Sequence, residues 1–202
     1  ELFARHRAGA SGAEIVQRFT ILLDAMICAL FKAAATDKDG ALLTDCALIA
    51  IGGYGRGELN PRSDIDIMFF CGSKDVAPLK KTTERLLYML WDLGLDVGYS
   101  VRSTKDCLEM SQHDITARTA LLDSRFLIGN RELFKDYKKN VYYDALSRNT
   151  QGFIRAKLEE NEVRRKKYGS TVYLLEPNIK EGEGGLRDLH SALWIMRVKY
   201  KA

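Results

Sequence analysis

Two aspartates, Asp64 and Asp66, stand one residue apart at the start of the apolar run DIDIMFF. A β-strand sends residues i and i+2 to the same face, so the two carboxylates should lie side by side while Ile65 and Ile67 point into the core. Two neighbouring carboxylates repel each other unless a cation lies between them, and hard divalent ions such as Mg²⁺ prefer oxygen ligands. The pair therefore predicts a metal site.

A double glycine precedes the aspartates. Gly52 and Gly53 follow an apolar run, residues 46–51 (CALIAI), which is typical of a buried strand. The two glycines allow a turn that side chains would block, and a short helix after the turn would point free N–H groups at an anion. Ten residues separate Gly53 from Asp64, which gives the pattern G-G…D-h-D-h, where h is apolar. Each half is common in structural roles, but together they indicate a nucleotide phosphate held beside a metal.

This combination resembles the nucleotidyltransferase superfamily that includes DNA polymerase beta. The wording GGYGRGELNPRSDIDI, residues 52–67, resembles more closely the nucleotidyltransferase domain of the bifunctional PII uridylyltransferase/uridylyl-removing enzymes of nitrogen regulation. A second segment, EPNIKEGEGGLRD at residues 176–188, is similar to the block that follows the catalytic core in that family. The resemblance spans about residues 48–200, and we expect the corresponding fold: an α+β mixed sheet flanked by helices, with additional helices at both ends.

The resemblance implies a third carboxylate on a later strand. The best candidate is Asp96, within LDVGYSV at residues 95–101, and Asp92 on the preceding helix is a weaker competitor. The alternative for Asp96 is a solvated residue in a helix-terminating turn. The family's mechanism would make Asp64, Asp66 and Asp96 both the catalytic residues and the ligands of Mg²⁺ or Mn²⁺.

Six residues are candidates for contact with the nucleotide: Gly52, Gly53, Arg56, Ser63, Lys180 and Arg187. The glycines would hold the triphosphate through backbone N–H groups. Arg56 could bind a phosphate oxygen or be a solvated turn residue, and Ser63 could bind a phosphate or cap a turn. Lys180 and Arg187 bracket a glycine-rich loop that could fold over the nucleotide, although loop solubility and helix capping explain them as well.

The implied reaction is the transfer of UMP from UTP to a tyrosine hydroxyl of the PII signalling protein, with release of pyrophosphate. The UTP preference follows from the resemblance, since no residue is identifiable as reading the base. Two alternatives stay open: a nucleotidyltransferase with a different acceptor, and a non-catalytic module that binds nucleotides for regulation. The family also leads us to expect a phosphohydrolase domain of the HD type and ACT domains in a longer chain.

The composition fits a cytoplasmic enzyme domain: 202 residues, 46% hydrophobic, 29% charged, with a net charge of +4. The charge is mild and mixed in sign, so a nucleic-acid partner is not expected. Four cysteines stand far apart without metal-ligand spacing, which indicates reduced core thiols. The longest apolar stretch is too short to span a bilayer, so a membrane role is not expected. The three histidines show no ligand spacing and are expected to be structural or exposed, and Trp194 is expected in the core or at an interface.

Three segments follow from the periodicity: an N-terminal bracing helix in residues 1–40, a catalytic core in 41–130 and a helical extension in 131–202. The helical period predicts helices near residues 13–35, 76–93, 104–111, 115–122, 131–146 and 152–168. Strands are expected near residues 46–51, 64–70, 95–101 and 125–128. The charged run at residues 159–167 is typical of a solvated helix face.

Overall fold

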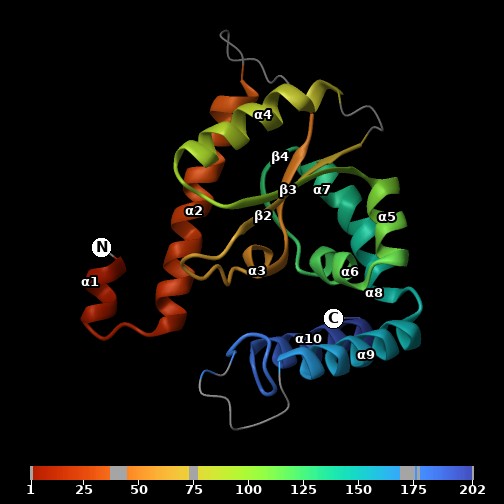
Figure 1. Cartoon of the computed structure of the whole chain (residues 1–202). Helices are drawn as coiled ribbons and strands as arrows, with labels where there is room; N and C mark the ends of the chain where they lie inside the picture. The colour runs from red at the N-terminus through yellow and green to blue at the C-terminus, as the bar shows by residue number, and fades with distance from the viewer. Residues whose placement is uncertain (1, 37–44, 73–76, 169–175, 177, 202) are drawn as a thin grey trace.

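The computed structural model describes residues 2–36, 45–72, 77–168, 176 and 178–201, as an α+β fold (Figure 1). Its elements are α1 (Leu2–Arg7), α2 (Gly12–Ala35), β1 (Ala47–Ala50), α3 (Gly52–Gly55), β2 (Ile65–Cys71), α4 (Ala77–Asp92), β3 (Val97–Ser103), α5 (Thr104–His113), α6 (Ile115–Leu122), β4 (Arg125–Gly129), α7 (Arg131–Tyr137), the π-helical segment η1 (Lys138–Tyr142), α8 (Tyr143–Ser147), α9 (Thr150–Tyr168) and α10 (Leu186–Tyr200).

The four strands form one mixed sheet in the order β3-β2-β1-β4. β1 runs antiparallel to both β2 and β4, whereas β2 and β3 are parallel. A parallel pair needs a crossover connection, and α4 provides it. Gly94 ends that crossover with a φ of +72°, a conformation that glycine adopts without strain. The register places Asp66 beside Gly98, so the aspartate pair lies next to the first residues of β3.

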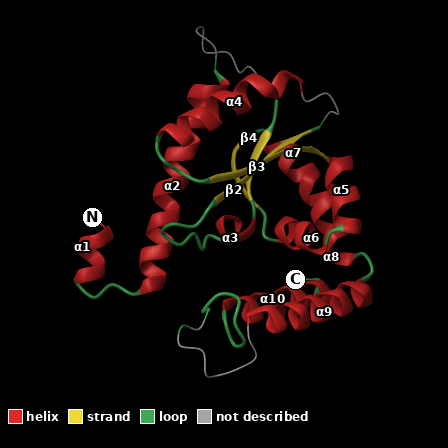
Figure 2. Cartoon of the chain, in the orientation of Figure 1, coloured by secondary structure: helices red, strands yellow, loops and turns green. Residues whose placement is uncertain are grey.

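Helices cover both faces of the sheet, as Figure 2 shows. On one face, α2 and α4 pack residues such as Phe31 and Leu86 against Ile65, Ile67 and Phe69 of β2. On the other face, α5, α6, α7 and η1 cover the alternate residues of the strands. Because Asp66 belongs to this second set, at the beginning of β2, it lies where the helical cover gives way to a pocket.

The long helix α2 braces the sheet, as its periodicity predicted. The Thr20 hydroxyl accepts a hydrogen bond from the backbone N–H of Leu59, at 3.2 Å, just after the glycine turn. Asp24 forms an ion pair with Arg125 of β4 at 2.7 Å, and Arg125 also donates to the Tyr54 carbonyl oxygen at 3.1 Å. This helix therefore ties the glycine turn to the edge strand of the sheet.

The helices α9 and α10 lie side by side below the sheet in the view of Figure 1. A third core cluster joins them to the rest, with Phe153 and Trp194 packed against Leu122 and Leu146. The loop before α10 is tied to itself, because Asn178 accepts from two backbone N–H groups and the N–H of Arg187 donates to the carbonyl oxygen of residue 180. These hydrogen bonds hold residues 178–187 in one conformation at the start of α10.

Three features differ from the sequence expectations. The predicted single helix at residues 131–146 contains the π-helical segment η1 between α7 and α8, and α1 is an additional short helix. The charged face of α9 is not simply solvated, because Lys157 and Arg164 are buried, and Arg164 pairs with Asp188. For the helix predicted near residues 76–93, residue 76 lies outside the described residues. Within the described part of the chain, no helix has the length and apolarity needed to cross a membrane.

Candidate nucleotide-binding site

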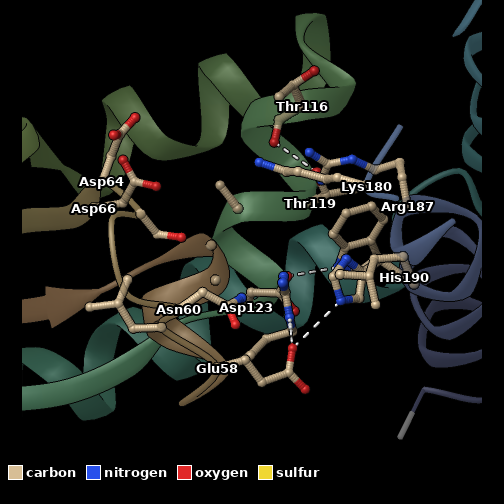
Figure 3. Close-up of a pocket in the computed structure, with 18 of the residues that line it drawn as sticks. Glu58, Asn60, Asp64, Asp66, Thr116, Thr119, Asp123, Lys180, Arg187 and His190 are labelled. Carbon is tan, nitrogen blue, oxygen red and sulfur yellow. Dashed lines mark hydrogen bonds and ion pairs between the residues drawn. The ribbon is translucent and has the colours of Figure 1, made fainter. Parts of the chain in front are cut away.

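A pocket of about 440 Å³ opens at the glycine turn, between the start of β2, helix α6 and the loop that leads into α10. Figure 3 shows Asp64 and Asp66 on one wall, with Lys180 and Arg187 across from them. All six residues predicted for the nucleotide and two of the three predicted carboxylates line this pocket. Segments more than 100 residues apart in the sequence therefore meet at one site.

The two aspartates lie on one side of the chain at the start of β2, as the strand alternation predicted. Ile65 and Ile67 are buried in the core, whereas Asp64 is exposed and Asp66 is half-buried. Two glycines leave room for the Asp66 carboxylate. A Cβ at Gly98 would stand 2.5 Å from its Oδ1, and a Cβ at Gly52 would stand 3.4 Å from its Oδ2. The carboxylate thus occupies a cradle that a side chain on β3 would fill.

Burial raises the pKa of the Asp66 carboxyl, and the nearby Asp64 carboxylate raises it further. Lys180 acts in the opposite direction and lowers that pKa from the far side of the pocket. Burial and the repulsion from Asp64 both disfavour the negative charge on Asp66, and a bound cation would stabilise that charge. Mg²⁺ typically binds through one or two carboxylates together with water and substrate phosphates, so this pair fits its needs.

Asp96, the predicted third carboxylate, does not line the pocket. It is exposed at the start of β3, where its carbonyl oxygen accepts from the Ile65 N–H at 2.8 Å. Asp96 stands directly before Val97, the first residue of β3, so its backbone lies beside the start of β2. In the described residues, however, no three His, Cys, Asp or Glu side chains are grouped to hold a metal ion. The structure therefore brings two of the three proposed ligands together, and a metal role for Asp96 stays a prediction.

The glycine turn has the shape that its sequence predicted. Gly52 adopts a φ of +60°, and α3 begins there, directly after β1. A Cβ at Gly55 would stand 1.6 Å from the Asp123 carbonyl oxygen, so Gly55 is fixed by packing. At Gly53, which lines the pocket, a Cβ would meet nothing closer than Arg56 at 3.7 Å.

Arg56 is bound within the protein rather than free for a phosphate. Its guanidinium forms ion pairs with Asp123 at 2.6 Å and with Glu58 at 2.8 Å, and these carboxylates raise its pKa against the effect of burial. Arg56 still lines the pocket, so it bears on the site chiefly by holding the turn in place. Ser63 also lines the pocket, and its backbone N–H donates to Asn60 at 3.0 Å.

Lys180 and Arg187 bring the C-terminal part of the chain to the pocket. Arg187 pairs with Glu181 at 3.1 Å within its own loop. Among the described residues Lys180 forms no ion pair, and its charge acts on Asp66. A pocket with two carboxylates on one wall and two cations on the other suits a metal-bound triphosphate.

Several residues that line the pocket were missed by the sequence analysis. Thr116, Thr119 and Asp123 follow the helical spacing i, i+3, i+7, and they place one polar face of α6 and its C-cap along the pocket. His190, expected to be structural or exposed, also lines the pocket and lies 3.5 Å from Glu58. The spacing on α6 was a usable signal, whereas His190 gave none.

A mixed sheet that carries an aspartate pair beside a glycine turn, opposite Lys180 and Arg187, defines a nucleotidyltransferase-like α+β protein. The family model of the GlnD PII-uridylyltransferase matches residues 152–202. Along its whole length, in an alignment of 207 residues, the chain is 40% identical to a bifunctional uridylyltransferase/uridylyl-removing enzyme of Azospirillum brasilense. The chain belongs to the PII-uridylyltransferase family. It spans 22% of the length of that relative.

Proposed function

We propose that this chain is the transferase part of a uridylyltransferase, which moves UMP from UTP to a tyrosine hydroxyl of the PII signalling protein and releases pyrophosphate. The observation that carries the proposal is the pairing of Asp64 and Asp66 across a 440 Å³ pocket from Lys180 and Arg187. The family membership supports the choice of uridylyl group and acceptor.

Asp64 and Asp66 would hold Mg²⁺ or Mn²⁺, with Asp96 as a further candidate ligand. When bound, such an ion neutralises phosphate charge and lowers the pKa of a coordinated hydroxyl. The attack forms a bond between the tyrosine oxygen and the α-phosphorus, and the bond from that phosphorus to the bridging oxygen of pyrophosphate breaks. A tyrosine hydroxyl has a pKa of about 10, so its proton needs an acceptor at neutral pH.

The other side chains would orient the nucleotide. Gly52 and Gly53 line the pocket and would bind a phosphate oxygen through their backbone N–H groups, and Ser63 lies between this turn and the aspartates. Lys180 and Arg187 would bind the charged tail that leaves as pyrophosphate. The four cysteines are thiols, three of them buried, which fits the reducing conditions of the cytoplasm, where we place the reaction.

The direct test is transfer of label from α-labelled UTP to purified PII in the presence of Mg²⁺. Asp64→Asn and Asp66→Asn should each abolish transfer, while Asp136→Asn, the same change at an exposed position on α7, should not. Transfer that persists in both pocket variants would refute the carboxylate roles. Metal-dependent UTP binding without transfer to PII would favour a different acceptor, and UTP binding that needs no metal would favour a regulatory module.

A further inference from the structure

A second cavity, of about 250 Å³, lies beside the nucleotide pocket and shares with it only Arg56 and Asp123. Its lining also includes Lys138 and Tyr142 from η1 and Arg197 from α10, none of which lines the nucleotide pocket. Nothing in the proposed reaction uses these three residues. The cavity therefore needs an explanation of its own.

Cations outnumber carboxylates around this cavity. Arg56, Lys138 and Arg197 face a single acidic side chain, Asp123, which is completely buried. That carboxylate already accepts hydrogen bonds from Arg56 at 2.6 Å, from Arg197 at 2.8 Å and from the indole N–H of Trp194 at 2.9 Å. It has little capacity left for another cation.

Lys138 is the unbalanced group. In the described part of the chain it forms no ion pair, and its ammonium instead lies 3.4 Å from the centre of the Tyr142 ring. Burial lowers its pKa to about 8, and the positive charge of Arg197 contributes to this. An aromatic face compensates only in part for a lost hydration shell. A half-buried ammonium that faces a guanidinium is the arrangement that an anion would stabilise.

The backbone at this point is also unusual. The segment Lys138–Tyr142 is π-helical between two α-helical segments, and such interruptions are frequent at functional sites. Lys138 and Tyr142, four residues apart on this segment, are in contact, and both line the cavity.

We propose that this cavity binds a small oxyanion, of the phosphate or carboxylate type, between Lys138 and Arg197. The proposal goes beyond the transferase function and does not depend on it. The site also has a physical link to the glycine turn, because Arg197 and Arg56 donate to the same Asp123 carboxylate. An anion that draws Arg197 toward itself would change how firmly Asp123 holds Arg56.

The test is a titration of the whole chain with inorganic phosphate, observed through the side-chain NMR signals of labelled lysines at constant ionic strength. The Lys138 signal should shift as phosphate is added and reach a plateau, and the pKa of Lys138 should rise by about 1. Malonate in place of phosphate would show whether carboxylates bind as well. Chloride at equal ionic strength should produce no saturable shift.

Matched variants separate this cavity from the nucleotide pocket. Lys138→Met should remove the part of the thermal stabilisation by phosphate that comes from this cavity. Lys139→Met changes the exposed neighbour on η1 and should leave that stabilisation intact. A chain with Lys180→Met and Arg187→Met should retain the Lys138 shift. Loss of the shift in that double variant would mean that phosphate acts from the nucleotide pocket, and a Lys138 signal that never saturates would also overturn the proposal.

Discussion

The position of the Asp66 carboxylate depends on two neighbours that have no side chain. Gly52 and Gly98 provide the space that it occupies, while Asp64 raises its pKa and Lys180 lowers it. The alternation of aspartate and isoleucine predicted that the pair would share one face. The contribution of Gly98 could not be predicted, because it follows from the register of two strands joined by a long crossover.

Gly98→Ala should inactivate the site with little loss of stability. The new Cβ would stand 2.5 Å from the Asp66 Oδ1 and push the carboxylate aside. A displacement of about 1 Å in an active site can lower the rate about 100-fold. Two quantities are measured for each variant: the rate of UMP transfer, and the urea concentration at the midpoint of unfolding. Ser100→Ala, two residues further along the same face of β3, is the control and should transfer UMP at the wild-type rate. A wild-type rate in Gly98→Ala would show that the space at Gly98 is unimportant.

Lys138 should make stability depend on pH. Its pKa is about 8 in the folded protein, against 10.5 for a free side chain, so between these values the unfolded chain binds more protons. The free energy of unfolding should therefore rise with pH across that window, relative to Lys138→Met. Urea unfolding of both proteins from pH 7.5 to 10.5 measures the difference. Parallel curves would contradict the lowered pKa, and Lys139→Met should run parallel to the wild type.

At the scale of elements, one buried carboxylate connects three parts of the fold. Asp123 caps the end of α6 and accepts from Arg56 next to α3 and from Trp194 and Arg197 of α10. Figure 3 shows it below the polar face of α6, at the floor of the nucleotide pocket. The glycine turn, the pocket wall and the C-terminal helix are therefore mechanically coupled through this residue.

Asp123→Asn should loosen that coupling. The change leaves two guanidinium groups without their shared charge, and breaking one partner of a buried ion pair costs about 3 kcal/mol. We expect the free energy of unfolding to fall by about this amount, and Trp194 fluorescence to change as its indole partner weakens. Asp136→Asn makes the same substitution on the surface and should have no measurable effect. Unchanged stability in the Asp123 variant would contradict the role assigned to this carboxylate.

Most elements could be predicted because their signals are local. The apolar runs around residues 48 and 68 indicate strands, and Gly94 marks the end of the crossover helix. The π-helical segment left no such signal, since η1 has the composition of an ordinary helix. The burial of Arg164 also escaped prediction, because its partner Asp188 lies 24 residues away in the chain.

At the scale of the whole molecule, the nucleotide pocket is made by two distant halves. The sheet contributes the aspartates, and the loop before α10 contributes Lys180 and Arg187. The resemblance to a known family predicted that both motifs belong to one site. It did not reveal the contribution of α6 or His190, because these depend on how the C-terminal helices pack against the core.

Lys180→Met should weaken nucleotide binding without unfolding the chain. Its charge reaches the aspartate side of the pocket, and a hydrogen bond from a charged group contributes about 2 kcal/mol. The dissociation constant for UTP in the presence of Mg²⁺ should rise at least about tenfold. Lys166→Met on the exposed side of α9 is the matched control, and equal affinity in the two variants would show that the loop does not contact the nucleotide.

The most direct measurement is Mn²⁺ binding, followed by electron paramagnetic resonance, in the presence of a non-hydrolysable UTP analogue. The wild-type chain and Lys138→Met should bind the ion together with the nucleotide, whereas Asp66→Asn should lose this binding. That result would place the metal-bound nucleotide at the aspartate pair. Equal Mn²⁺ binding by Asp66→Asn and the wild type would contradict the proposed site.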